Sequence, residues 1–412
     1  MPPPLANRRC DPVWAWSMRS LLFLPCLAVA ACGPGYAEHL DLSSSGTGPK
    51  DVVVYARAPQ LGKGSHTLES VTLTEIAGPA AGLRTPRDLA FNPLRPDELW
   101  VVNLDDDSVT IVFDASKPTR TTERRKDAFA LHFMERPSSI AFGAEQTTIG
   151  KPGTFGTCQE SRNTYDDRAP PNDFMGPALW SSDLTVYAQS DPHGLGAHLD
   201  MLHESPNCMG IAHERDNVYW VFGGKAQTGV GAARQLPIPA IVRYDFGADH
   251  GIGTDDHSNG EVAQYAELQV KDVPGVPSHL VFDPSTKLLY IADTGNARIA
   301  KLDTTSGTRG AALQAQEPLV GYYRMDGATV TDVVPQSSQL LTRPSGLELF
   351  DGFLFVSDNA TGRISAFTPQ GEQVNWLDTG LAGALSGIAF GPDGRLYLVD
   401  MLGNRVLRVD PK

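Results

Sequence analysis

The chain has 412 residues, of which 41% are hydrophobic and 20% charged, and its formal net charge is −14. This composition excludes an intrinsically disordered protein, and 40 glycines and 31 prolines favour many short strands joined by turns over a helical bundle. The negative balance argues against nucleic acid and anionic lipid headgroups as partners, because both would repel an acidic surface.

The N-terminus has the pattern of an export signal. Met18 and Arg19 precede an apolar run, Leu21 to Ala31, which is too short to span a bilayer. We therefore predict a signal peptide over residues 1–31, with Met18 as an alternative start of translation.

The end of this segment, Val29-Ala30-Ala31-Cys32, resembles a bacterial lipobox, and an ordinary cleaved signal is the alternative. The resemblance implies that Cys32 is acylated and that residues 32–63, rich in glycine, proline and serine, form a flexible tether. Loss of the leader would change the net charge from −14 to −16, since it carries three arginines and one aspartate. The expected location is the cell envelope, with lipid as the sole membrane attachment. Gly33 favours the outer membrane, and a periplasmic or extracellular form is the alternative.

The cysteines agree with export. Cys10 and Cys26 lie in the leader and Cys32 would carry lipid, which leaves Cys158 and Cys208. In an oxidising compartment these two would form a disulfide, with two free buried thiols as the alternative.

A repeat runs through the C-terminal half. Similar openings occur at residues 277–282, 344–349 and 385–390, each followed by a polar turn and an apolar strand that ends in aspartate. An arginine stands five residues after each aspartate, which gives Asp293 with Arg298, Asp358 with Arg363, and Asp400 with Arg405. We interpret these pairs as structural: the aspartate accepts backbone hydrogen bonds from the turn and the arginine lies across it.

This unit resembles the NHL repeat, which forms one blade of a β-propeller. Weaker openings at 86–91, 137–142 and 208–213 bring the number of units to six. Further strands are expected at residues 99–103, 109–113, 184–188, 218–222 and 241–244. The resemblance implies an all-β, six-bladed propeller over residues 64–412, monomeric, with long loop insertions.

The last unit ends after its third strand, so we expect a strand around Leu68 to Ile76 to close the ring. The shortest interval between units, Leu347 to Ile388, matches a bare blade of roughly 40–45 residues, and the longer intervals therefore contain the insertions. Six aromatic residues near the insertions are expected mainly to pack between blades, although some would line a pocket for a sugar or a peptide. They are Trp180, Tyr187, Tyr219, Trp220, Phe222 and Tyr244.

Histidines suggest a transition-metal site. His198 and His203 lie in an insertion, and His279 stands at a unit opening, where propeller residues face the axial channel. Neutral imidazoles that converge there would suit zinc. We therefore predict His203 and His279 as ligands, with His198 as a third, against the alternative of hydrogen-bonded loop histidines.

A second candidate site is a glycine-rich acidic loop that contains Asp249, Asp255 and Asp256. Carboxylate oxygens on such a loop are what calcium prefers, although the spacing differs from an EF-hand and a solvated acidic loop is the alternative.

Known activities of the NHL class transfer poorly. The peptide-amidating lyases use three metal-binding histidines at blade openings, whereas the openings here hold histidine only at His279. Propeller lactonases are similar in fold alone, and the sequence has no Gly-x-Ser-x-Gly elbow, His-Glu-x-x-His string or phosphate-binding loop.

Two hypotheses follow. The first is a binding module that contacts a protein, peptide or carbohydrate through its insertions. The second is a metal-dependent lyase or hydrolase with an ion near the propeller axis.

Overall fold

The computed structural model describes residues 57–224, 240–267 and 269–412. The predicted signal peptide 1–31, Cys32 and most of the predicted tether 32–63 lie outside these residues. None of the described helices is long and apolar enough to cross a membrane.

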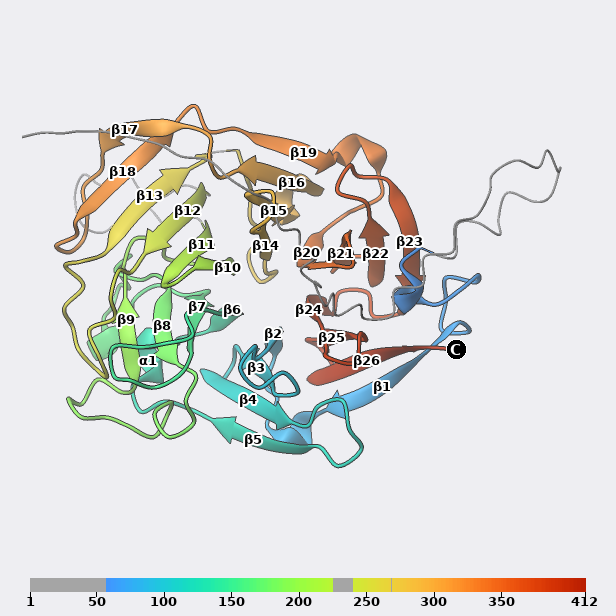
Figure 1. The fold of residues 1–412 in the computed structure, drawn as a ribbon, viewed down its shortest axis with the longest axis horizontal. Coiled ribbons are helices and arrows are strands. Elements are labelled where there is room, and N and C mark those ends of the chain that lie inside the picture. The colour runs from blue at the N-terminus through green and yellow to red at the C-terminus, as the bar shows by residue number, and fades with distance from the viewer. Residues whose placement is uncertain (1–56, 225–239, 268) are drawn as a thin grey trace, which may run out of the picture. The chain divides into compact units, whose positions relative to one another are not determined.

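Six β-sheets surround a common axis, as Figure 1 shows. Blade 1 consists of β2 (Pro86–Phe91), β3 (Leu99–Asn103), β4 (Ser108–Phe113) and β5 (Thr121–Arg125), and blade 2 of β6 (Pro137–Phe142), β7 (Thr154–Gln159), β8 (Ala178–Ser181) and β9 (His198–Met201). Blade 3 consists of β10 (Gly210–Arg215), β11 (Val218–Gly223), β12 (Ala240–Asp245) and β13 (Glu261–Tyr265). Blade 4 consists of β14 (Leu280–Asp283), β15 (Leu288–Asp293), β16 (Arg298–Asp303) and β19 (Val330–Val334). Blade 5 consists of β20 (Pro344–Phe350), β21 (Phe353–Asp358), β22 (Arg363–Phe367) and β23 (Gln373–Asp378).

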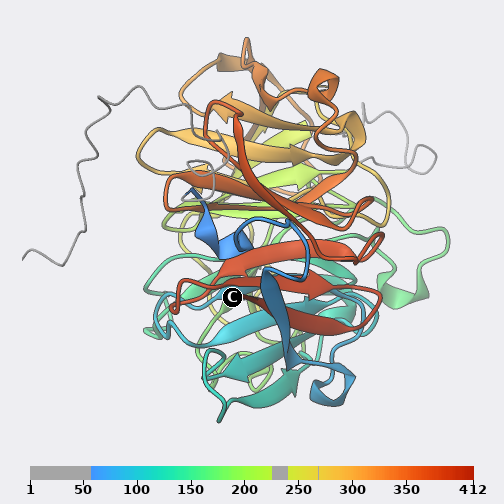
Figure 2. The same ribbon diagram turned by 90° about the vertical axis from the view of Figure 1, so that its right-hand side faces the viewer.

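Blade 6 closes the ring. It combines β24 (Leu385–Phe390), β25 (Leu396–Asp400) and β26 (Arg405–Pro411) with the N-terminal β1 (Val71–Ala77), which pairs antiparallel with β26. The two ends of the propeller therefore share one sheet, as Figure 2 shows beside the C-terminus. The predicted six-bladed propeller and its closing strand are confirmed.

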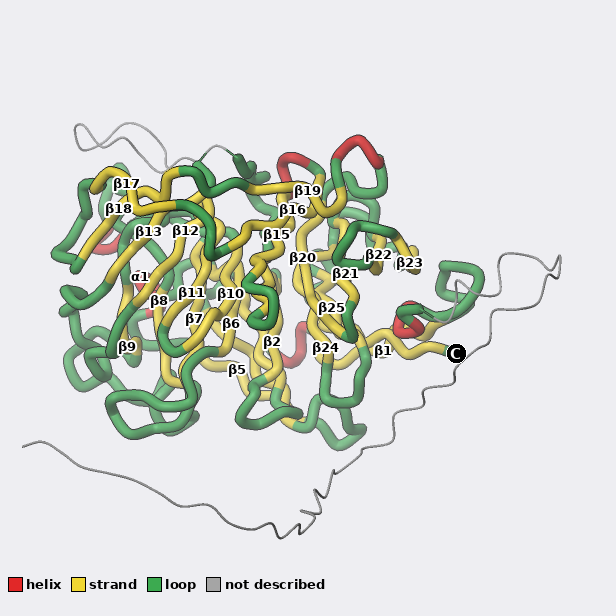
Figure 3. Tube along the Cα trace, turned by 45° about the horizontal axis from the view of Figure 1, so that its top comes forward, coloured by secondary structure: helices red, strands yellow, loops and turns green. Residues whose placement is uncertain are grey.

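Blade 3 is larger than the others. The chain between β16 and β19 forms a hairpin, β17 (Thr308–Ala312) and β18 (Gly321–Asp326), and β18 pairs in parallel with β13 to extend the blade 3 sheet. Figure 3 shows these two strands beside β12 and β13. A loop of blade 4 is thereby fixed against blade 3, where it contributes to the candidate site.

The core is divided among the interfaces between blades. Within the described residues there are six clusters of buried apolar side chains, one at each interface. The six aromatic residues that we expected mainly to pack between blades are all fully or almost fully buried in this core.

Serine side chains join neighbouring blades near the axis. Ser138 Oγ donates to the carbonyl of Cys208 at 2.7 Å, and Ser345 Oγ donates to the carbonyl of Pro277 at 2.8 Å. Ser386 Oγ donates in the same way to the carbonyl of Arg87, which connects blade 6 to blade 1. The serine of these openings thus has a structural role, because it satisfies buried carbonyls at the blade junctions.

The predicted contact between aspartate and arginine is present in two of the three units. Arg298 Nε donates to Asp293 at 2.7 Å, and Arg405 Nη2 donates to Asp400 at 2.6 Å. Asp358 instead accepts the backbone amides of Thr342, Arg343 and Thr361, and Arg363 lies over the ring of Trp376 at 4.7 Å.

One expected strand is absent. Residues 184–188, predicted as a strand of the second unit, form a turn that Asp183 stabilises by accepting the amide of Thr185. The third strand of blade 2 is β8, which precedes this turn. Val186 and Tyr187 belong to the turn, and their side chains are buried in the core although they are not in a strand.

Candidate metal centre and binding pocket

An axial cavity of about 330 Å³ lies between the inner strands of the blades. Asp88 of β2, His279 before β14 and Glu348 of β20 line it. His279 Nδ1 lies 3.5 Å from Asp88 Oδ1, and Asp88 also accepts the amides of Leu89 at 2.8 Å and Ile140 at 3.0 Å. His279 therefore faces the axis, as the sequence predicts, but its neighbours there are carboxylates rather than other predicted ligands.

Close packing explains why three of the other openings hold glycine. A Cβ atom on Gly210 would clash with the carbonyl oxygen of Ser278, and one on Gly387 would clash with Asp88. Gly346 is enclosed in the same way by the backbone of Ser386. Three of the six openings thus have no room for any side chain. Two of the other three hold Asp88 and Ser139, so His279 is the single histidine at an opening.

Two carboxyl groups near the axis have raised pKa values. Burial, and then the charge of Asp88, raises the pKa of Glu348 to about 8. Burial also raises the pKa of Asp88, although the charge of His279 and two backbone hydrogen bonds oppose the shift. Glu348 is therefore largely protonated near neutral pH.

Replacement of Glu348 by glutamine should change how stability depends on pH. The folded-state pKa of about 8 lies above the ordinary value of 4.5, so the stabilisation is complete below about pH 4.5 and is lost as the pH rises through 8. Glu348→Gln removes this loss, and the melting temperature of the variant relative to the unchanged protein should increase between pH 5 and pH 9. Calorimetry over this range measures it, and parallel curves would contradict the prediction.

A second cavity, of about 470 Å³, opens at the side of the ring between blades 2 and 3. We call it the lateral pocket. Insertions from several blades form it, including α1 (Ala130–Phe133) before blade 2 and the loops before β13 and β18. Its lining consists of Phe129, His132, Phe133, Asn163, Tyr165, Arg168, Phe174, Leu195, His203, Asp255, Asp256, His257, Ser258, Glu317 and Pro318.

Three lining residues bring possible metal-ligand atoms together. One donor atom each from His203, His257 and Glu317 lies within 4.8 Å of the others, and this is the one such group found among the described residues. His203 follows β9, His257 lies in the loop between β12 and β13, and Glu317 lies between β17 and β18. Three separate insertions therefore supply the three side chains.

His203 is fixed in position by contacts with Glu317 and Phe174. Its Nδ1 lies 2.9 Å from Glu317 Oε2, and its backbone amide donates to Glu317 Oε1 at 2.8 Å. The Phe174 ring stacks on the imidazole with 3.7 Å between centroids, and only 2% of the residue is exposed. Burial lowers the pKa of His203, so the ring is uncharged at neutral pH.

His257 has a carboxylate partner of its own. Its Nδ1 lies 2.7 Å from Oδ1 of Asp200, which is fully buried in β9. Burial lowers the pKa of His257, but the hydrogen bond and charge of Asp200 outweigh it, and the net shift is upward. Since Asp200 occupies Nδ1, Nε2 is the nitrogen that His257 can offer to a ligand.

Two further histidines, His132 and His198, lie close to the group of three. His132 Nε2 lies 3.3 Å from His203 Nε2, and burial lowers the pKa of His132 to about 3. His198, the third predicted ligand, stacks on Phe133 at 3.5 Å, and burial lowers its pKa to about 4. His198 Nδ1 contacts the carbonyl of Leu195, and the residue does not line the pocket.

The structure thus separates the predicted ligands. His203 lies in the lateral pocket and His279 in the axial cavity, so the two do not share one site. The register of the repeat correctly places His279 at an opening, but the insertion that carries His203 folds onto the outer edge of blade 2.

The acidic loop does not gather its carboxylates. Asp249 is buried and accepts hydrogen bonds from the amide and hydroxyl of Thr148 and from the amide of Gly251. Asp255 and Asp256 are exposed at the rim of the lateral pocket. The predicted calcium ligands are therefore apart, and the carboxylate of Asp249 is occupied by protein donors.

Sequence reasoning missed Glu317, Asp200 and His132. Glu317 lies 114 residues from His203, and nothing in its local sequence marks it. The one available signal for His257 was its place in the acidic loop.

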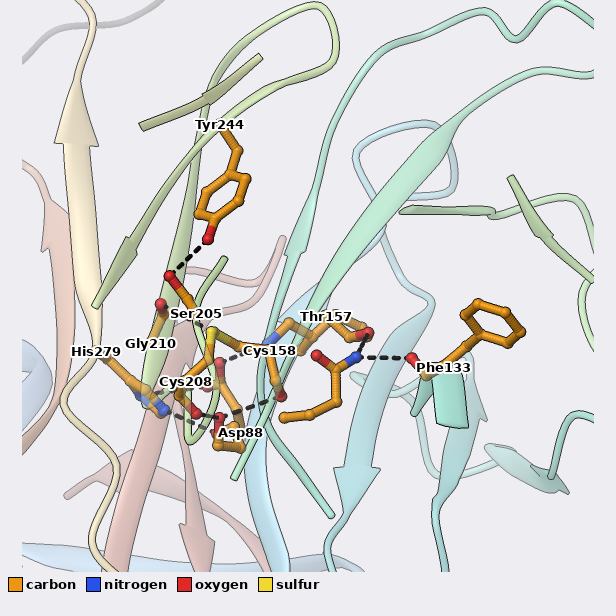
Figure 4. Close-up of a disulfide and its surroundings, with 12 residues drawn as sticks. Asp88, Phe133, Thr157, Cys158, Ser205, Cys208, Gly210, Tyr244 and His279 are labelled. Carbon is orange, nitrogen blue, oxygen red and sulfur yellow. Dashed lines mark hydrogen bonds and ion pairs between the residues drawn. A yellow bond between two sulfur atoms is a disulfide. The ribbon is translucent and has the colours of Figure 1, made fainter. Parts of the chain in front are cut away.

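The predicted disulfide is confirmed. Cys158 of β7 and Cys208, just before β10, are bonded with their Cα atoms 5.3 Å apart. Figure 4 shows that the bond lies close to both Asp88 and His279 and to the segment that contains Ser205. It joins blades 2 and 3, the two blades that bound the lateral pocket, and such a bond is typical of proteins outside the cytosol.

Comparisons with known proteins show similarity in fold. No family model and no curated protein sequence matches the chain. A luciferin-regenerating enzyme is 14% identical with a TM-score of 0.50, over 82% of this chain and 95% of that chain. An auxiliary nutrient binding protein from Bacteroides ovatus is 14% identical (TM-score 0.45, 79% of this chain, 69% of that chain). The calcium-binding protein regucalcin from Agrobacterium tumefaciens is 14% identical (TM-score 0.47, 83% and 96%). These similarities concern the fold alone: the chain is a six-bladed β-propeller.

Proposed function

We propose that the protein is a binding module of the cell envelope and that the lateral pocket is its ligand-binding site. The observation that carries this proposal is the convergence of insertions from different blades on one cavity of about 470 Å³. This volume lies within the range of small-molecule sites, roughly 300–1,000 Å³, and aromatic walls with a few polar groups are typical of them.

The lining favours a short peptide or an amino acid. Phe129 and Tyr165 offer apolar surface, Arg168 offers a cation, and Asp255 and Asp256 offer carboxylates at the rim. A zwitterion with an apolar side chain matches this set, because its carboxylate pairs with arginine and its ammonium group with the aspartates.

Two probe series test the ligand class. Phenylalanine-containing dipeptides should raise the melting temperature of the protein, and disaccharides at equal concentration should not. Phe129→Ala and Arg168→Ala should each weaken dipeptide binding at least 10-fold in calorimetric titrations. Leu402→Ala is the matched control, because Leu402 is 72% exposed and does not line the pocket. Binding of disaccharides alone, or dipeptide binding unchanged in both pocket variants, would contradict the proposal.

The envelope location rests on the lipobox-like Val29 to Cys32 and agrees with a disulfide-bonded domain. Metabolic labelling with a radioactive fatty acid should mark the protein and fail to mark a Cys32→Ser variant. Labelling of both the unchanged protein and the Cys32→Ser variant, or of neither, would contradict a lipid anchor at Cys32.

The axial cavity supports a second candidate, a metal-dependent lyase or hydrolase. The observation in its favour is that Asp88, His279 and Glu348 line one cavity. This candidate requires an ion beside His279. Anomalous diffraction from a metal-loaded crystal would show whether the ion lies in the axial cavity or in the lateral pocket, and so distinguishes the two candidate functions.

A further inference from the structure

The lateral pocket contains side chains of the type that bind transition metals. His203, His257 and Glu317 offer two imidazole nitrogens and one carboxylate oxygen, with donor atoms within 4.8 Å of each other. Two histidines and one glutamate form the ligand set of many zinc sites with an open fourth position. Calcium, in contrast, requires six or more oxygen ligands.

Each histidine is oriented by a second group. Asp200 accepts from His257 Nδ1 at 2.7 Å, which directs His257 Nε2 away from the carboxylate. His132 Nε2 lies 3.3 Å from His203 Nε2 and can accept its hydrogen, which leaves His203 Nδ1 on the side of Glu317. Metal-bound histidines almost always donate their other N–H in this manner.

Glu317 is also held in place. Its Oε1 accepts the amide of His203, so Oε2 is the oxygen that remains available. The adjacent Gln316 donates its backbone amide to Glu204 at 2.6 Å and its side-chain amide to the carbonyls of Asp173 and His203. The β17–β18 connection is therefore tied to the loops of blade 2 next to the candidate oxygen.

We propose that His203 Nδ1, His257 Nε2 and Glu317 Oε2 bind one zinc-class divalent ion at the inner wall of the lateral pocket. Ligands at 2.0–2.1 Å from a tetrahedral ion lie about 3.3–3.4 Å apart. The present 2.9 Å between His203 Nδ1 and Glu317 Oε2 needs to open by a few tenths of an ångström. The uncharged His203 ring has one N–H hydrogen, and on metal binding it moves from Nδ1 to Nε2, where His132 Nε2 can accept it, so that Nδ1 becomes free for the ion.

His203, His257 and Glu317 all line the lateral pocket. The fourth coordination position of the ion therefore faces the space that we assign to the bound peptide or amino acid. The inference deepens the proposed function, because the ion would meet the carboxylate or amide of a bound peptide. Metal binding is nevertheless measurable without any peptide, so the two proposals fail separately.

Zinc titration tests the site. The protein with Cys32→Ser, exported so that its disulfide forms and then freed of metal with a chelator, should bind one Zn²⁺ per chain with a Kd below about 1 μM. Co²⁺ in place of zinc should give the intense visible absorption of a tetrahedral centre. His257→Ala and Glu317→Ala should each weaken binding at least 100-fold, and Asp200→Asn, as a positioning change, about 10–100-fold.

Two histidines provide matched controls. His250 belongs to the same loop as His257 but pairs with Asn259 and Asp256, so His250→Ala should bind zinc as tightly as the parent protein. His279→Ala should also leave zinc binding unchanged, because His279 lies in the axial cavity. Circular dichroism verifies that each variant is folded. Three results would overturn the proposal. They are the absence of stoichiometric zinc, zinc binding that persists in folded His257→Ala and Glu317→Ala variants, and loss of zinc binding in His279→Ala.

Discussion

A chain that begins at Gly78, and so lacks β1, should not form a stable propeller. Without β1, strand β26 has a free edge along its whole length, and the contacts of Val71 and Ile76 with blades 5, 6 and 1 are lost. Burial of two such side chains contributes about 1.5–3 kcal/mol each, and domains are stable by only about 5–15 kcal/mol in total. We expect loss of the cooperative melting transition and aggregation through the exposed edge, measured by circular dichroism and light scattering.

A chain that begins at Arg57 is the control for this truncation, because it retains β1 and the 3₁₀ turn Pro59–Leu61 that packs on blade 6. A synthetic peptide of residues 68–78 added during refolding should restore part of the transition of the shorter chain. A chain from Gly78 that stays monomeric and melts at the same temperature as the chain from Arg57 would show that the ring does not depend on β1.

Replacement of both Cys158 and Cys208 by serine should lower the free energy of unfolding by about 4 kcal/mol. The bond closes a loop between residues 50 apart in sequence, and the loss of chain entropy in the unfolded state gives this size. Both cysteines are fully buried among the apolar residues between blades 2 and 3, so the cost falls on the interface beside the lateral pocket. Guanidinium unfolding measures the change through its midpoint.

A reductant provides the control. Reduction of the unchanged protein should reproduce the shift, and the same reductant should leave the serine double variant unaffected. Because Cys208 follows the segment that carries His203, zinc affinity should also fall in the variant. Equal unfolding midpoints for the two proteins would mean that this bond does not stabilise the fold.

The architecture could be predicted because it depends on short-range patterns. The Pro-Ser openings, the strands that end in Asp293, Asp358 and Asp400, and the missing fourth strand of the last unit are all local signals. The structure confirms the blades that they predict, and the ring follows from the count of six. The error at residues 184–188 arose because an apolar turn anchored by Asp183 has the same composition as a short strand.

The candidate site could be predicted only in part, because insertions assemble it. His203 stood out as one of several histidines, but its partners Glu317 and His132 come from segments 114 and 71 residues away. A repeat pattern fixes the positions of blade residues such as His279, whereas it contains no information about where an inserted loop folds. The same reasoning explains Asp249, whose carboxylate is bound by Thr148, 101 residues distant.

The most direct test of the account is the position of the metal in a crystal of the zinc-loaded protein. Anomalous diffraction measured on both sides of the zinc absorption edge locates the ion independently of any assumed ligand. The account predicts one strong peak at the inner wall of the lateral pocket, between His203, His257 and Glu317. A peak in the axial cavity beside Asp88 and His279, or no zinc peak at all, would contradict it.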